Sequence, residues 1–186
     1  IYTPDILTPE TKAQVYHFLP ISDYHKINFV WTVNNPYAEW EYKFYDVLNY
    51  ILSQESPDGI YFYFYQKGWC KDISFSRICG NKHFGIYTLD INLTTLGYEN
   101  KNSIITILNY ILHEKILSLN LAEIFNFYQK LALINFNWGS EITPLDLALK
   151  LGQNCFYYDY EHLYSGDYLI KQIDIAKFKD WYKATI

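Results

Sequence analysis

The sequence predicts an α+β fold, in which several helices pack on an antiparallel sheet. Residues 25–33 alternate between apolar and polar side chains, as a strand with one buried face does. Residues 36–51 and 103–131 instead carry apolar side chains every three or four positions, which is typical of helices packed on a core. We find no internal repeat and no Ser/Gly-rich linker, so we expect residues 1–186 to form one domain.

The predicted sheet is a meander of about three to five strands. The first strand is 25–33, with its apolar side chains on one face. The aromatic run at 60–65 has high β propensity, and Lys67-Gly68 offers a turn back into 69–75, so these segments predict a hairpin. Residues 83–93 alternate again and predict a further strand.

Capping residues predict where the helices begin. Hydroxyl, amide and carboxylate side chains satisfy the free N–H groups of a first turn, and proline suits the first helical position. The helix-rich segment 103–152 could form a subdomain, although composition marks no boundary for it. The expected starts are Thr8-Pro9, Asn35-Pro36, Ser103, Asn120, Thr143-Pro144 and Asp174, the first of these helices running to about residue 19.

Composition argues against several classes of function. The net charge is −5 and Arg77 is the only arginine, so a basic surface for nucleic acid is not expected. No apolar run approaches the ~20 residues of a membrane span. Cys70, Cys79 and Cys155 make an odd count, which favours reduced thiols. We therefore expect a soluble cytoplasmic protein, with no nucleic acid or membrane as partner.

Residues 155–168 are the most distinctive stretch of the chain. They contain five tyrosines and three carboxylates, without lysine or arginine. Tyrosine is enriched at protein interfaces, and acids beside it favour a basic partner. We expect this stretch to form a strand and a turn that present a partner-binding surface. Its predicted contact residues are Tyr157, Asp159, Tyr160, Glu161, Tyr164 and Asp167.

This acidic, aromatic-rich composition resembles that of the immunity proteins that neutralise bacterial toxins. The resemblance implies a non-catalytic inhibitor that masks a basic protein such as a toxin, although no sequence signature identifies the family. A viral or mobile-element adaptor with the same surface is an open alternative. Neither reading requires a cofactor or a metal, and neither specifies an oligomeric state.

A second alternative is an enzyme. Residues 83–87, His-Phe-Gly-Ile-Tyr, look like the histidine strand of NlpC/P60-type papain-like hydrolases. The resemblance implies a thiol nucleophile, for which Cys70 or Cys79 would pair with His83. His113-Glu114 begins like the zinc motif H-E-x-x-H, but Leu117 occupies the position of its second histidine. A zinc site is therefore not expected there.

Overall fold

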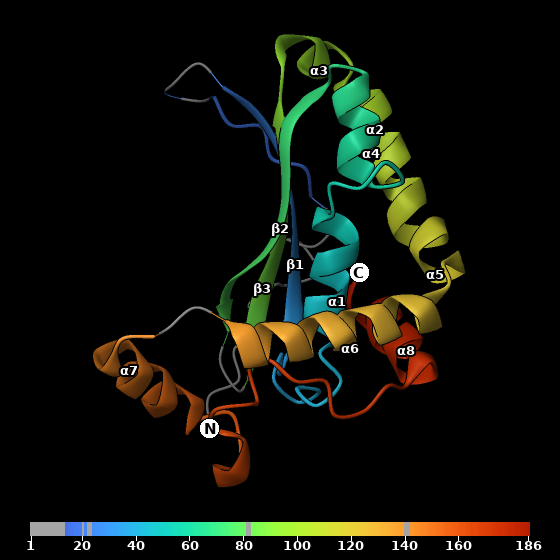
Figure 1. Ribbon diagram of the computed structural model, residues 1–186. Coiled ribbons are helices and arrows are strands. Elements are labelled where there is room, and N and C mark those ends of the chain that lie inside the picture. The colour runs from blue at the N-terminus through green and yellow to red at the C-terminus, as the bar shows by residue number, and fades with distance from the viewer. Residues whose placement is uncertain (1–13, 20, 22–23, 81–82, 140–141) are drawn as a thin grey trace.

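The centre of the fold is a three-stranded antiparallel sheet, which confirms the predicted α+β class (Figure 1). The computed structural model describes residues 14–19, 21, 24–80, 83–139 and 142–186. The strands are β1 (His25–Asn34), β2 (Cys70–Gly80) and β3 (Phe84–Leu93). Their order is β1-β3-β2, so the spatial order differs from the chain order and β3 lies in the middle.

The two faces of the sheet differ in polarity because side chains alternate along each strand. One face carries rows of apolar residues across the three strands, such as Phe29 opposite Leu89 and Leu89 opposite Phe75. The other face is mainly polar, although Val30, opposite Thr88, is 54% exposed on it. There Lys26 forms an ion pair with Asp90 at 2.9 Å.

In the described part of the chain, the helices that pack on the sheet cover its apolar face. α1 (Phe44–Ser53), α2 (Ile60–Gln66) and α4 (Lys101–Tyr110) lie on one side of the sheet, and α6 (Leu121–Trp138) crosses near one end (Figure 1). The remaining elements are α3 (Thr95–Glu99), a π-helical turn η1 (Ile111–Lys115), α5 (Ile116–Ser118), α7 (Pro144–Asn154), a 3₁₀ turn η2 (Tyr160–His162) and α8 (Ile175–Thr185).

Aromatic side chains join the helices to the sheet in one core. Phe44 of α1 meets Phe125 of α6 and Phe178 of α8 edge to face, with ring centroids 6.2 and 5.5 Å apart. Tyr87 of β3 is fully buried beside Phe75 of β2. Edge-to-face pairs add specific geometry to the free energy of apolar burial, so these contacts fix how α6 and α8 sit on the sheet.

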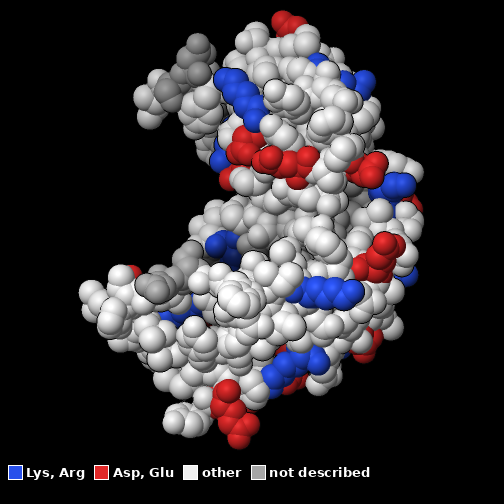
Figure 2. Space-filling model, viewed as in Figure 1, with Lys and Arg blue, Asp and Glu red and all other residues white. Residues whose placement is uncertain are grey.

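Among the described residues, no helix lies over the polar face of the sheet (Figure 1). Figure 2 shows the molecule hollowed on the side away from α1, α2 and α4, between the end near α3 and the region of α7. Side chains on this face bond to one another: Ser76 and Thr88 share a hydrogen bond of 3.1 Å. Polar side chains on this face are therefore held by interactions with one another.

The prediction of a strand at 60–65 was wrong, because this segment forms α2. Ile60 and Phe64 are four residues apart and both are buried, as the inward positions of a helix are. The turn at Gly59 precedes α2, and α2 packs against β2. Tertiary burial of these two residues outweighs the β propensity of the aromatic run. The hairpin is instead formed by β2 and β3.

The prediction of a strand at 155–168 was also wrong. α7 continues to Asn154, and turns and η2 follow it. The helix expected at Asn35-Pro36 begins only at Phe44, because Lys43 adopts the left-handed conformation with φ 53°. Thr8-Pro9 lies outside the described residues, and residues 14–19 have no regular structure.

Two predicted helix caps are confirmed. The Thr143 hydroxyl accepts a hydrogen bond from the Asp146 amide at 3.2 Å, and the Asp174 carboxylate accepts one from the Lys177 amide at 2.9 Å. Among the described residues, no helix combines the length and the apolar character needed to cross a bilayer. The subdomain at 103–152 stays a prediction.

Candidate functional site

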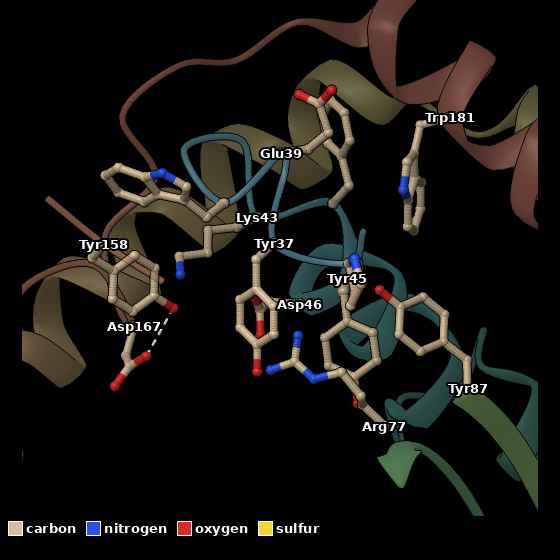
Figure 3. Close-up of a pocket in the computed structure, with 13 residues that line it drawn as sticks. Tyr37, Glu39, Lys43, Tyr45, Asp46, Arg77, Tyr87, Tyr158, Asp167 and Trp181 are labelled. Atoms are coloured by element: carbon tan, nitrogen blue, oxygen red, sulfur yellow. Dashed lines mark hydrogen bonds between the residues drawn. The ribbon is translucent and has the colours of Figure 1, made fainter. Parts of the chain in front are cut away.

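A small polar cavity lies where β1 and β2 end. The turn that follows β1 contributes Tyr37 and Lys43, β2 contributes Arg77, and the C-terminal segment contributes Tyr158 and Asp167 (Figure 3). Its volume is about 60 Å³. Segments that are distant in sequence thus bring cations, carboxylates and phenols to one place.

Lys43 is the most unusual of these residues. Only 5% of its surface is exposed, and its ammonium donates to the carbonyl of Gly166. The ammonium also lies 5.5 Å from the ring centroid of Tyr158. Burial lowers the pKa of Lys43, while Asp46 and Asp167 act in the opposite direction. A buried cation with these partners ties α1 to the C-terminal segment.

Asp167 is the centre of a hydrogen-bond network beside the cavity. Its carboxylate accepts from Asn154 at 3.0 Å and from the Tyr158 hydroxyl at 2.9 Å, and Lys150 lies 3.3 Å away. Burial alone would raise the pKa of Asp167, but these partners outweigh burial and lower it. The carboxylate is therefore held in its ionised form.

Arg77 is held by aromatic rings. Its guanidinium carbon lies 4.7 Å from the ring centroid of Tyr37 and 5.0 Å from that of Tyr45. Within the described ranges, no carboxylate lies within 4.0 Å of it as an ion-pair partner. Rings above a guanidinium leave its N–H edge available to a ligand.

Asp46 and Tyr87 also line the cavity. Burial raises the pKa of Asp46, although Lys43 and Arg77 act to lower it. The Tyr87 side chain is fully buried, and among the residues described no group forms a hydrogen bond of standard geometry with its hydroxyl. Burial raises the pKa of this hydroxyl, whereas the nearby Arg77 guanidinium acts to lower it. A buried hydroxyl without a partner is costly and uncommon, so this oxygen marks a place where a ligand or water would bond.

Part of the predicted contact surface points inward. Tyr157 stacks on Tyr37 with ring centroids 3.8 Å apart, and Asp167 serves the internal network. Tyr164 packs edge to face on Phe136 at 5.3 Å while remaining 48% exposed.

The other predicted contact residues face solvent. Tyr160 is 89% exposed, and Asp159 and Glu161 are exposed beside it. That these three contact a partner stays a prediction.

The thiol site expected from Cys70 and His83 was wrong. Cys70 pairs with Leu93 at one end of the sheet, whereas Gly80, near His83, pairs with Gly85 at the other end. At about 3.3 Å per residue the two lie roughly 30 Å apart. Burial also raises the pKa of Cys70 to about 11, so its thiol stays protonated. Cys79 lies in β2, but the structure does not describe its side chain, so it gives no test of a pair with His83.

The sequence analysis missed the principal lining residues of the cavity. Arg77 could have been singled out as the only arginine of the chain. No sequence signal marks Lys43, because its burial depends on the left-handed turn before α1 and on the distant Gly166.

The described residues offer no metal site. They contain no group of three or more His, Cys, Asp or Glu side chains placed to hold an ion. The sequence also contains neither H-E-x-x-H nor H-x-x-E-H, the helical motifs that bind zinc in two classes of metallopeptidase.

Two curated relatives are much longer than this chain. The chain is 22% identical over 160 residues to the A-factor-processing enzyme of Saccharomyces cerevisiae, covering 86% of the chain and 16% of that protein. It is 24% identical over 175 residues to a nardilysin-like protein of Arabidopsis thaliana, covering 90% and 17%. The chain therefore spans about a sixth of the length of these relatives. No family profile matches it.

Solved structures share the fold. Pitrilysin superposes with a TM-score of 0.74 at 17% identity, covering 86% of this chain and 17% of pitrilysin. A structure described as the inactive peptidase domain of a zinc protease from Bordetella parapertussis superposes with a TM-score of 0.61 at 10% identity. That match covers 88% of both chains, so the whole fold corresponds.

These findings overturn the functional prediction made from composition. The relatives are a processing enzyme and a nardilysin-like protein, and the solved structures with the same fold include a zinc protease domain, so the immunity-protein interpretation, with its basic toxin partner, was wrong. The description as an inhibitor was wrong for the same reason. Composition misled because aromatic and acidic side chains serve internal packing here, as Tyr157 and Asp167 show.

Proposed function

We propose that this chain is a metal-free domain of a zinc-peptidase-like protein, and that it holds peptide rather than cleaving it. The observation that carries the proposal is the correspondence of the whole fold with an inactive peptidase domain, in a chain whose described residues lack a metal-ligand cluster. The relatives, a processing enzyme and a nardilysin-like protein, support a peptide as the bound substrate.

The open face of the sheet is the surface we propose for peptide. Extended peptides commonly add to an exposed edge of a sheet, where main-chain groups give affinity and side-chain pockets give specificity, and the open face adjoins such edges. The polar face is hollowed and ordered by its own bonds, including that between Ser76 and Thr88 (Figure 2). β1 and β2 are the outer strands of this sheet.

Zinc content tests the first half of the proposal. The purified 186-residue chain, dialysed after exposure to zinc, should retain clearly less than one ion per chain by atomic absorption, because no ligand cluster holds it. It should also fail to cleave unstructured peptides. One tightly held zinc ion per chain together with peptide cleavage would contradict the proposal.

Photo-crosslinking tests the second half. A photoreactive phenylalanine derivative in place of Ser74, on the polar face of β2, should capture an unstructured peptide. The same derivative in place of Asn109, which is exposed on α4 at the other side of the sheet, is the matched control. Equal capture at the two positions would show that the polar face has no special role.

A further inference from the structure

We infer that the cavity beside β1 and β2 is a binding site for a carboxylate group, with the Arg77 guanidinium as its charged donor and the Tyr87 hydroxyl as its neutral donor. Arg77 and Tyr87 both line the cavity (Figure 3). The carboxylate site itself goes beyond the proposed function and is argued from the residues of the cavity.

The charges around the cavity favour an anion. Two cations, Lys43 and Arg77, and three carboxylates, Glu39, Asp46 and Asp167, line it. Asp167 is already paired with Lys150 and bonded to Tyr158, and Glu39 is paired with Lys177 at 2.7 Å, so only Asp46 faces the two cations without a partner outside the lining. The lining therefore keeps an excess of positive charge in a partly buried place, where electrostatic attraction is stronger than in water.

The donors suit a planar acid. A guanidinium presents N–H groups in a fork that matches the two oxygens of a carboxylate. The rings of Tyr37 and Tyr45 pack against the Arg77 guanidinium, with their centroids 4.7 and 5.0 Å from its central carbon. They therefore orient this fork. The hydroxyl of Tyr87 needs an acceptor, which a carboxylate oxygen provides.

The size of the cavity sets the kind of ligand. Its 60 Å³ is several times the ~10–15 Å³ that one ordered water requires on the same measure. A carboxylate group therefore fits this space. The carboxylate could belong to an acidic side chain or to the C-terminus of a peptide, and this part of the inference rests on the proposed function.

An NMR titration tests the site directly. Because Arg77 is the only arginine, the chain gives a single arginine Nε–H resonance. Sodium acetate should shift this resonance and reach saturation. Sodium chloride at the same ionic strength and neutral acetamide are the controls. A shift that does not saturate, or that either control reproduces, would overturn the inference.

Tyr87→Phe separates binding from folding. The variant keeps the buried ring and removes only the hydroxyl that lacks a partner, so the protein should remain folded. Loss of one hydrogen bond to the ligand should weaken acetate binding about five- to tenfold. Unchanged affinity in the folded variant would remove Tyr87 from the site and contradict the inference.

Asp46→Asn tests the location of the bound anion. Asp46 lines the same cavity, so removing its negative charge should strengthen acetate binding several-fold. Weaker binding would place the anion elsewhere.

Peptides identify the source of the carboxylate. One capped peptide carries a single Glu, its match carries Gln, and a third has Gln with a free C-terminal carboxylate. A shift of the Arg77 resonance by the Glu peptide identifies a side-chain carboxylate as the source, and a shift by the peptide with a free C-terminus identifies the terminal carboxylate. The capped Gln peptide should cause no shift. Acetate binding without binding of any peptide would uphold the carboxylate site and refute its use for peptides.

Discussion

At the residue scale, single polar side chains connect segments that are far apart in the chain. Asp167 accepts hydrogen bonds from Asn154 and Tyr158 and forms an ion pair with Lys150. Lys43 donates a hydrogen bond to the carbonyl of Gly166, which lies 123 positions away in the chain. Such partly buried contacts matter more than surface pairs, because leaving one partner unsatisfied costs its full desolvation free energy.

Asp167→Asn should lower the free energy of unfolding by about 2 kcal/mol at neutral pH, because several bonds to an ionised acceptor are weakened. The pKa of Asp167 is lowered in the folded state. Its contribution is therefore present above the ordinary aspartate pKa of about 3.9 and is lost as the pH falls through and below that value.

Urea unfolding between pH 7 and pH 3 measures this difference, which should shrink at the acidic end. Asp159→Asn, at an exposed position, is the control and should change stability by less than about 0.5 kcal/mol. A difference between Asp167→Asn and the original chain that stays constant with pH would argue against an ionised Asp167.

The cysteines should react in the order of their exposure. Cys155 is exposed and should be alkylated by iodoacetamide in the folded protein, whereas Cys70 is buried with a pKa of about 11 and should be protected. Mass spectrometry of the labelled peptides distinguishes the two. In guanidinium both should be labelled; early labelling of Cys70 in the native protein would contradict its burial.

At the element scale, close packing of backbone decides which glycines are required. A Cβ on Gly97 in α3 would lie 1.9 Å from the Trp69 carbonyl oxygen, so the helix can approach the start of β2 only with glycine there. Gly152 in α7 has open space around it. The same residue type thus has different reasons for its presence in two helices.

Gly97→Ala should destabilise the protein by at least about 2 kcal/mol, because the backbone of α3 or of Trp69 must shift. Gly152→Ala is the matched control and should stabilise by about 0.5–1 kcal/mol, since alanine loses less backbone entropy in a helix. The midpoints of urea unfolding compare them. Equal effects would mean that the contact between α3 and Trp69 is not tight.

At the scale of the whole molecule, an apolar surface remains uncovered on α7. Leu145 and Leu149 are four residues apart, so they share a face of the helix, and they are 69% and 59% exposed. Exposed apolar groups that share a face promote association.

The double variant Leu145→Lys/Leu149→Lys should therefore reduce self-association of the isolated chain without lowering its Tm. Sedimentation velocity over a range of concentrations measures association. Asn109→Lys, at an exposed position of α4, adds the same kind of charge elsewhere and should leave association nearly unchanged. A lower Tm in the double variant alone would show that the α7 face is part of the core.

Local signals predicted a large part of the fold. β1 and β3 follow the alternation seen in the sequence, and the caps at Thr143 and Asp174 follow from their side chains. The site was harder to predict. Of its lining, the sequence analysis singled out only Asp167 as a site residue, and expected it at the surface rather than in an internal network.

The sequence by itself determined the α+β class, the alternating strands and several helix starts, because these depend on periodicity and on contacts within one turn. Only the tertiary structure decided that residues 60–65 form a helix, that Lys43 is buried, and that Arg77 and Tyr87 line one cavity. These outcomes depend on burial against distant segments, and burial energy outweighs local propensity when the two differ.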